Sequence, residues 1–283
     1  MTRGALIFAF NNEETDYLEM AAWSAQNIRR HLNIPVAVVT DADAGDPRVS
    51  GFDQVITSSP ATGGTRYFED YAKTVSWHNA GRTDAYSLTP YDQTLVLDAD
   101  YVVADSDLNQ LWDQADFMCH RLAFDMSKGE GFLDELNCFG QYQMPMWWAT
   151  VMMFRRSNTA QYIFDCMNMV RHNWQHYRDL YGIQKATYRN DFALSIAIGI
   201  VSGHTFKVEE IPWPLASVMP STKLEKLDQD LYRLEYTHTN TKPYQISFAG
   251  YSFHAMGKKH LGDIVEADRR ARLLDSSTEH QRR

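Results

Sequence analysis

An apolar run that ends in two carboxylates constrains this chain more than any other stretch. Residues 94–97 are β-branched or aliphatic without alternation, the pattern of a strand buried on both faces of a parallel sheet. Asp98 and Asp100 follow directly, where such a strand would emerge. Ligands of open α/β sheets bind at that end. The pattern therefore predicts an α/β fold with a site at the carboxyl end of this strand.

The spacing of the two carboxylates indicates a cation. Residues two apart on a strand point to the same face, so Asp98 and Asp100 can bind one ion that offsets their repulsion. Carboxylate oxygens suit Mg²⁺ or Mn²⁺, and these ions bind diphosphates. The alternative is a strand end whose acidic residues cap a helix starting at residues 106–108.

Length and composition bound the remaining possibilities. The 283 residues, 44% of them hydrophobic, can bury one large core or two modest ones. No run of eighteen apolar residues and no signal-peptide pattern occurs, so we expect a soluble, cytoplasmic protein without a membrane segment. The cysteines are three in number and lack metal-ligand spacing, which favours reduced thiols.

The order of elements before the carboxylates indicates a doubly wound sheet. Strands are expected at residues 5–10, 36–40 and 54–57, and apolar residues at helical spacing predict a helix over 16–32 capped by Thr15. A second helix is expected over 68–80. Strand, helix, strand is the start of an α/β fold with a parallel sheet.

With these elements the chain resembles the nucleotide-sugar glycosyltransferases of the GT-A type, and within them the glycogenin-like group. The segments that carry the resemblance are the metal motif at 95–100, a returning strand at 148–154, an acidic segment at 188–197 and a late His-X-X-Gly element at 252–259. The resemblance covers about residues 5–260. It implies one GT-A domain over 1–265, with a nucleotide-binding half at 1–110 and a sugar and acceptor half at 111–265, followed by a basic helix or tail at 266–283.

The resemblance also implies roles for individual residues. A divalent ion, Mn²⁺ or Mg²⁺, would bind Asp98, Asp100 and His254, and the donor would be a nucleotide-diphosphate sugar. Asp191 would contact the sugar, and Lys258 or Lys259 would act as an electrophile on the diphosphate. The remaining nucleotide contacts implied are the following: Asn11, Thr40, Asp41, Lys73, Arg82, Asp98, Ala99, Gly257 and Lys258.

Two departures from the family pattern affect these assignments. Lys258 and Lys259 come one or two positions early, and His260 stands where the family usually has lysine. The returning strand lacks the usual Asn-Ser-Gly. The expected reaction is metal-assisted glycosyl transfer, with retention of the anomeric configuration implied by the glycogenin-like group.

Other function classes fit parts of the same sequence. A haloacid dehalogenase-type phosphohydrolase also carries Asp-X-Asp after an apolar strand, and Gly262-Asp263 with Asp268 mimics its last acidic motif. That family places its nucleophile strand near the start of the catalytic domain, whereas about ninety residues precede Asp98. A nucleotidyltransferase would have a Gly-rich loop after the first strand, which 11–15 is not. A non-catalytic nucleotide or sugar-binding module remains open.

The charge distribution bears on the acceptor. Residues 1–140 carry 9 Lys+Arg against 22 Asp+Glu, and residues 141–283 carry 18 against 14. Basic side chains interleaved with aromatic ones suit a polyanion. They are Arg155, Arg156, Arg171, Arg178, Lys185 and Arg189 with Trp174, Tyr177, Tyr181 and Tyr188, followed by Arg269, Arg270, Arg272, Arg282 and Arg283 in the tail.

Residues 145–149 and 188–194 are also similar to glycosyltransferase-like proteins of tailed phages, several of which glycosylate hydroxymethylated pyrimidines in DNA. One hypothesis is therefore a modified DNA base as acceptor, in the host cytoplasm if the chain is phage-encoded. The alternative acceptors are a glycan, a lipid-linked sugar or a protein.

Overall fold

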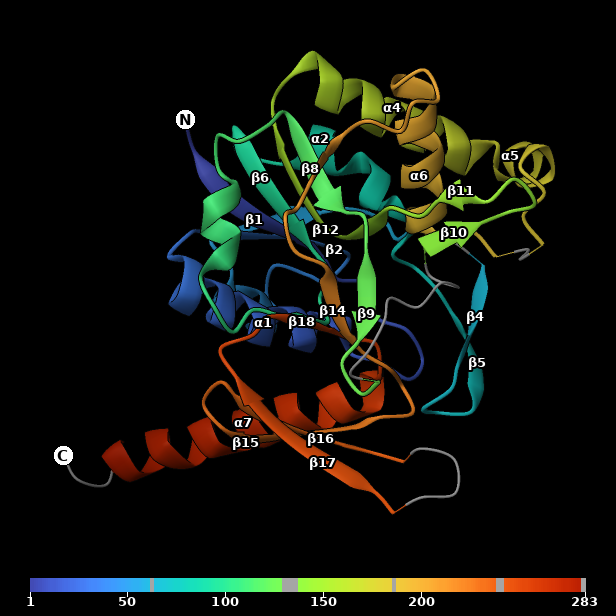
Figure 1. Ribbon diagram of the computed structural model, residues 1–283. Coiled ribbons are helices and arrows are strands. Elements are labelled where there is room, and N and C mark those ends of the chain that lie inside the picture. The colour runs from blue at the N-terminus through green and yellow to red at the C-terminus, as the bar shows by residue number, and fades with distance from the viewer. Residues whose placement is uncertain (62–63, 129–136, 185–186, 238–241, 281–283) are drawn as a thin grey trace.

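The computed structural model describes residues 1–61, 64–128, 137–184, 187–237 and 242–280 (Figure 1). Within these residues a seven-stranded sheet has the order β13-β8-β12-β6-β1-β2-β3. All of its neighbouring strands pair in parallel except at β12, which runs antiparallel to β6 and to β8. Its strands are β1 (Arg3–Phe8), β2 (Val36–Thr40), β3 (Gln54–Thr57), β6 (Gln93–Leu97), β8 (Phe117–His120), β12 (Trp148–Arg155) and β13 (Glu209–Glu210). The expected α/β class with a mostly parallel central sheet is confirmed.

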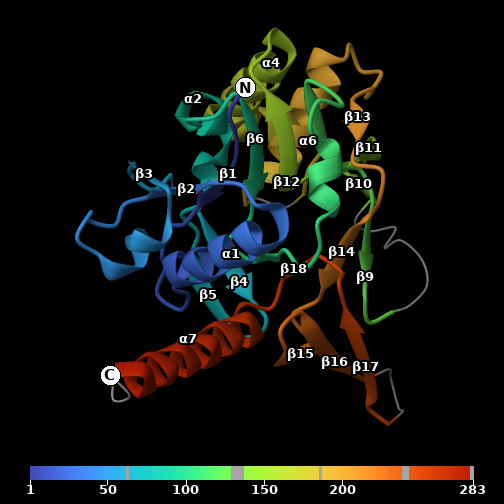
Figure 2. The same cartoon turned by 90° about the vertical axis from the view of Figure 1, so that its left-hand side faces the viewer.

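Helices cover both faces of this sheet, as Figures 1 and 2 show. The helix α1 (Tyr17–Leu32) packs on one face, and α4 (Asn158–His172) and α6 (Asn190–Val201) pack on the other. In β6, Leu95 and Leu97 enter the core cluster on the α1 side, and Val96 enters the opposite cluster. The absence of alternation in this strand thus reflects burial on both faces.

A second, smaller sheet brings the segment that follows β6 next to residues 253–255, near the C-terminal helix. Its order is β7-β18-β14-β9, with β7 (Tyr101–Val102), β9 (Ala123–Asp125), β14 (Leu215–Val218) and β18 (Phe253–Ala255). Only the residues 98–100 separate β6 from β7. The chain therefore passes from the large sheet into the small one through the Asp-Ala-Asp segment.

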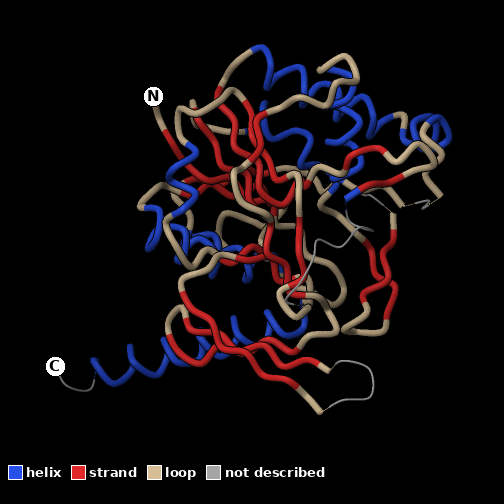
Figure 3. Tube along the Cα trace, in the orientation of Figure 1, coloured by secondary structure: helices blue, strands red, loops and turns tan. Residues whose placement is uncertain are grey.

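The remaining elements lie around these two sheets (Figure 3). A three-stranded antiparallel sheet packs near the helix α7 (Lys258–His280), and a hairpin, β4 (Thr65–Phe68) with β5 (Lys73–Ser76), projects beside the site. Other elements are β10 (Cys138–Phe139), β11 (Met144–Pro145), β15 (Lys223–Asp228), β16 (Leu231–Tyr236), β17 (Tyr244–Ala249), α2 (Ala85–Leu88), α5 (Trp174–Leu180), and the 3₁₀ turns η1 (Pro47–Gly51), η2 (Ala80–Asp84) and η3 (Asp107–Leu111).

The structure corrects two local predictions. The helix predicted over residues 68–80 is wrong, because this segment forms the β4–β5 hairpin, whose turn has Ala72 at φ 51°. Side chains along β4 alternate in exposure, the pattern of a strand with one face packed, and Val75 is the buried residue of β5. The cap of α1 is Asp16 and not Thr15, since the Asp16 carboxylate accepts a hydrogen bond from the Glu19 amide at 3.0 Å.

Two further observations concern the chain as a whole. None of the helices in the described ranges is long and apolar enough to cross a membrane. The helix α7 runs continuously through position 266, where the tail was expected to begin. The division into a domain and a tail stays a prediction.

Candidate functional site

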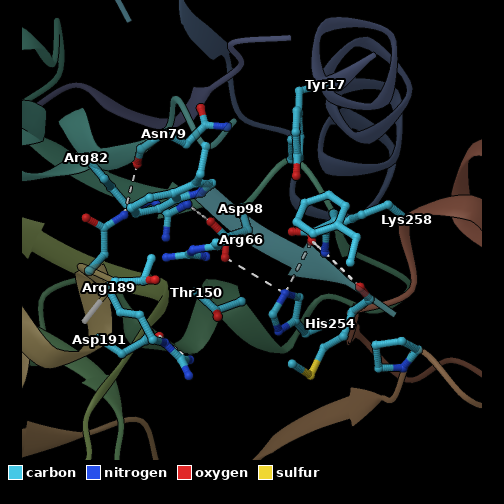
Figure 4. Close-up of a pocket in the computed structure, with 18 of the residues that line it drawn as sticks. Tyr17, Arg66, Asn79, Arg82, Asp98, Thr150, Arg189, Asp191, His254 and Lys258 are labelled. Atoms are coloured by element: carbon cyan, nitrogen blue, oxygen red, sulfur yellow. Dashed lines mark hydrogen bonds and ion pairs between the residues drawn. The ribbon is translucent and has the colours of Figure 1, made fainter. Parts of the chain in front are cut away.

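A cleft of about 710 Å³ opens at the carboxyl end of β6. Its walls come from the start of α1, the β4–β5 hairpin, the start of α6 and the β18–α7 junction (Figure 4). Asp98, Ala99 and Asp100 lie at its floor beside His254. The cleft therefore lies where ligands bind in open α/β sheets.

Backbone pairing explains how His254 reaches the carboxylates. In the small sheet His254 of β18 is paired with Tyr101 of β7, and the Ala255 amide donates to the Asp100 carbonyl at 3.0 Å. The His254 Nε2 atom lies 3.4 Å from Asp100 Oδ2 and 3.9 Å from Asp98 Oδ2. One ligand atom from each of the three residues lies within 4.8 Å of the other two.

The three side chains fit a hard divalent cation. Two carboxylate oxygens and one imidazole nitrogen form a donor set that suits Mn²⁺ or Mg²⁺. All three side chains are at most 13% exposed, so an ion here would bind in a largely desolvated position. His254 directs Nε2 toward the carboxylates, while its Nδ1 is buried without a hydrogen-bond partner among the described residues.

Basic side chains neutralise both carboxylates. Arg82, a buried residue of η2, forms an ion pair with Asp98 and donates to the Ala149 carbonyl at 3.1 Å. Lys258 at the start of α7 forms an ion pair with Asp100. Burial alone would raise the pKa of Asp100, but Lys258 and His254 hold it below its usual range. Asp100 is consequently a carboxylate at neutral pH.

Asp191 faces the same cleft from the first turn of α6. Its carboxylate accepts a hydrogen bond from the Ala149 amide at 3.0 Å and pairs with Arg189 at 2.6 Å. Burial opposes ionisation, yet Arg189 and the Ala149 amide keep the pKa of Asp191 below its ordinary value. Asp191 can therefore accept hydrogen bonds from a ligand but is a weak proton acceptor.

The residues predicted for the nucleotide divide into two groups. Arg82, Asp98, Ala99 and Lys258 line the cleft, as do Asp100, Asp191 and His254. Six other residues predicted to contact the nucleotide do not line the cleft within the described part of the chain. They are Asn11, Thr40, Asp41, Lys73, Gly257 and Lys259.

Local bonds explain several of these outlying positions. The Asn11 side chain accepts from the Leu18 amide at 3.0 Å at the start of α1. Lys73 lies on β5 and not on the helix predicted over residues 68–80, and it pairs with Glu14 at 2.6 Å. The Lys259 amide donates to Asp70 at 2.8 Å. Their binding roles stay predictions.

Several cleft residues had no signal in the sequence. Trp77 belongs to the stretch that was predicted as a helix, Arg66 lies two residues before that stretch, and Arg189 was considered only as part of a polyanion surface. Tyr17 opens α1 and Asn79 precedes η2. No spacing rule relates these positions to the carboxylates, because tertiary pairing alone brings them together.

The arginines predicted to form a polyanion surface mostly have acidic partners. Arg155 pairs with Asp116 at 2.5 Å, Arg171 with Asp84 at 3.1 Å and Arg178 with Asp179 at 3.0 Å. Arg269 and Arg270 both pair with Glu266. Trp174 and Tyr188 pack edge to face with ring centres 5.6 Å apart. Lys185, Arg282 and Arg283 lie outside the described residues.

Comparison with known proteins gives the following. No protein-family model matches the chain, and a search of curated proteins found no match. Among solved structures, the apo form of the glycosyltransferase GlyE of Streptococcus pneumoniae TIGR4 matches at 13% identity, covering 75% of this chain and 45% of that one, with a TM-score of 0.41. The chain thus spans less than half the length of GlyE.

Two other solved structures are similar at the same level. The galactosyltransferase LgtC in complex with donor and acceptor sugar analogs matches at 13% identity, covering 68% of this chain and 70% of that one, with a TM-score of 0.44. The 4-diphosphocytidyl-2C-methyl-D-erythritol synthase from Anaerococcus prevotii DSM 20548 matches at 10% identity, covering 74% and 88%, with a TM-score of 0.35.

Proposed function

We propose that this chain is a metal-dependent glycosyltransferase that moves a sugar from a nucleotide-diphosphate sugar to an acceptor hydroxyl. One observation carries the proposal: Asp98, Asp100 and His254 converge within 4.8 Å on the floor of a cleft that also presents Arg82, Lys258 and Asp191. A cation site surrounded by further cations suits the binding of a diphosphate.

The residues of the cleft support a division of roles. Asp98, Asp100 and His254 would hold Mn²⁺ or Mg²⁺, which when bound neutralises charge that develops on the leaving nucleoside diphosphate. The Lys258 ammonium lies beside Asp100 and also donates to the Met256 carbonyl at 3.0 Å. It is therefore positioned to stabilise a diphosphate oxygen. The Arg82 guanidinium supplies a second buried positive charge on the other side of Asp98.

The environment of Asp191 favours retention of the anomeric configuration. An inverting reaction needs a carboxylate base in reach of the acceptor hydroxyl. Asp191 pairs with Arg189 and has a lowered pKa, both of which weaken it as a base. We propose that Asp191 orients the sugar and that the product linkage keeps the donor configuration, which nuclear magnetic resonance of the product tests.

The phosphohydrolase alternative has less support from the geometry. Its last acidic motif would have to meet Asp98 in the cleft. Asp263 and Asp268 lie on α7 and are not among the described residues around the cleft. Asp268 instead accepts from Trp23 Nε1 at 2.7 Å and pairs with Lys226.

For the acceptor, the DNA hypothesis stays a prediction beside a glycan, lipid or protein acceptor. The acidic partners of Arg155, Arg171 and Arg178 reduce the free positive charge on which that hypothesis rested. Nucleoside mass spectrometry that detects sugar transfer to hydroxymethylated DNA would support DNA as the acceptor.

One experiment separates the enzyme classes. The purified chain is incubated with a panel of nucleotide sugars in Mn²⁺ or in chelator, and released nucleoside diphosphate is measured beside phosphate released from p-nitrophenyl phosphate. We expect metal-dependent diphosphate release, lost in Asp98→Asn and kept in the control Asp165→Asn, an exposed position on α4. Phosphate release from the monoester with no diphosphate release would refute the proposal.

A further inference from the structure

Arg66 is the cation in the cleft that the proposed chemistry does not use. It lies on β4, and its guanidinium stacks on the Trp77 ring with 3.4 Å between the guanidinium carbon and the ring centre. Nη2 donates to the Tyr188 carbonyl at 3.2 Å. Tyr188 in turn stacks on Trp77 with ring centres 6.0 Å apart. These contacts hold the guanidinium near the N-terminus of α6, on the side of the cleft where Arg189 and Asp191 lie (Figure 4).

The charges of the cleft leave Arg66 without an acidic partner. Arg82 pairs with Asp98, Lys258 with Asp100 and Arg189 with Asp191. Among the described residues, no carboxylate oxygen lies within 4.0 Å of an Arg66 nitrogen, although Glu69 and Asp70 follow on the same hairpin. The only hydrogen bond that its guanidinium makes within those ranges is the one to the Tyr188 carbonyl.

Partial burial in the cleft disfavours the charge of the Arg66 guanidinium. Removal from solvent, together with the nearby Arg189 guanidinium, lowers the pKa of Arg66 to about 9. The group stays charged at neutral pH but is held in a position that disfavours its charge. A bound anion would remove that penalty.

We define the arginine corner as Arg66, Trp77, Arg189 and Asp191. Two guanidinium groups and one carboxylate leave one net positive charge there, which matches a monoanionic group. A planar carboxylate also fits the paired N–H groups of a guanidinium. The corner includes Asp191, the residue proposed to orient the sugar, and does not include Lys258, the residue of the same cleft proposed to bind the diphosphate.

We infer that the arginine corner binds a sugar carboxylate, with Arg66 as the residue that binds it, so that one of the two substrates is a hexuronic acid. This inference rests on the proposed function and adds the substrate class. The carboxylate belongs either to the donor sugar or to the acceptor sugar, and the two are distinguished by separate arms of one experiment.

The donor arm uses matched pairs of nucleotide sugars. Calorimetry in Mn²⁺ compares UDP-glucuronate with UDP-glucose and GDP-mannuronate with GDP-mannose. We expect the acidic member of one pair to bind wild type about ten-fold more tightly or better. Arg66→Gln should weaken that member by about ten- to a hundred-fold, the scale of a lost hydrogen bond to a charged group, and change the neutral member by less than about two-fold.

The acceptor arm uses free glucuronate and glucose, each titrated into the protein with Mn²⁺ and a nucleoside diphosphate and also without either. Preference for glucuronate in this arm, lost in Arg66→Gln, assigns the carboxylate to the acceptor. Arg66→Lys keeps the charge and should keep part of the preference. Arg270→Gln on the exposed face of α7 should change nothing. The unchanged affinity for the neutral probe shows that each variant is folded.

Two results would overturn the inference. An equal loss for acidic and neutral nucleotide sugars in Arg66→Gln would assign Arg66 to the diphosphate. The absence of any acid preference in both arms would remove the carboxylate site. If the nucleotides fail to bind while glucuronate still binds through Arg66, the proposed function fails and the arginine corner stands.

Discussion

Replacing Asp100 by Asn tests the metal assignment and the charge pairing together. The side chain is 7% exposed, offers one of three ligand groups and forms the ion pair with Lys258. Loss of one preorganised electrostatic contact costs about two to three orders of magnitude in rate, or about 3–4 kcal/mol. We expect Asp100→Asn, and likewise Asp98→Asn, to reduce turnover of the nucleotide sugar by this factor at saturating Mn²⁺.

The same substitution should also destabilise the fold. It leaves the Lys258 ammonium, in a side chain 13% exposed, without its carboxylate. An uncompensated charge in a closed interior costs about 3–5 kcal/mol. The Ala255 and Met256 carbonyls accept from Lys258 Nζ and the cleft is open to solvent, so we expect about 1–2 kcal/mol.

Two measurements check this reasoning. Urea unfolding gives the free energy of unfolding, and Mn²⁺-dependent release of nucleoside diphosphate gives the rate. The double variant Asp100→Asn/Lys258→Met should recover most of the lost stability and none of the lost rate. Full activity of Asp100→Asn in chelator would refute the metal assignment, and no recovery in the double variant would refute the charge pairing.

Three further predictions concern His120, Gly4 and the binding of Mn²⁺ at the proposed cation site. Burial of His120, whose Nδ1 contacts the Trp213 carbonyl at 2.9 Å, lowers its pKa from 6.5 to about 4. As the pH falls, His120 therefore becomes protonated in the unfolded chain before it does in the folded one. Up to about 3 kcal/mol of the free energy of unfolding is lost between pH 6.5 and about 4. His120→Gln should flatten the pH dependence of the free energy of unfolding measured in urea. Gly4→Ala would place Cβ 2.4 Å from the Tyr91 ring and cost about 1–3 kcal/mol in thermal unfolding, whereas Gly45→Ala, with nothing within 4 Å, should be near neutral. Mn²⁺ at a hundred times its Kd should stabilise wild type by about 2.7 kcal/mol, and an unchanged melting temperature, or an equal rise in His254→Ala, would contradict the site.

Features carried by one strand and its own burial could be predicted from the sequence. The run at residues 94–97 indicated β6 because a strand covered on both faces needs apolar residues without alternation. The spacing of Asp98 and Asp100 likewise predicted two carboxylates on one side of the cleft, although they lie in the turn after β6, where the Tyr101 amide donates to the Asp98 carbonyl at 3.0 Å, and not on the strand itself. Both inferences needed only neighbouring residues.

Features that depend on distant partners could not be predicted in this way. Residues 68–80 were predicted as a helix, yet residues 65–76 form a hairpin, and Trp77 directly after it packs against Tyr188. His254 was placed by resemblance alone, since its position depends on the pairing of β18 with β7. Arg66 lines the cleft because it lies on β4 of the same hairpin, which was not predicted, so it was not recognised as a cleft residue. Tertiary contacts overrode local pattern at each of these places.

The junction of the two sheets has a consequence for biosynthesis. Lys258 and Asp100 are 158 positions apart, and the β18 segment is further tied to residues 104–105 through Ser252, whose amide donates to Asp105 at 2.6 Å. On the ribosome, β1, β2 and β6 with α1 can form a parallel sheet long before residues 252–258 leave the exit tunnel. A nascent chain therefore displays its two carboxylates without the imidazole and the ammonium that complete the site. The three side chains of the proposed cation site can therefore come together only after residue 254 has been translated.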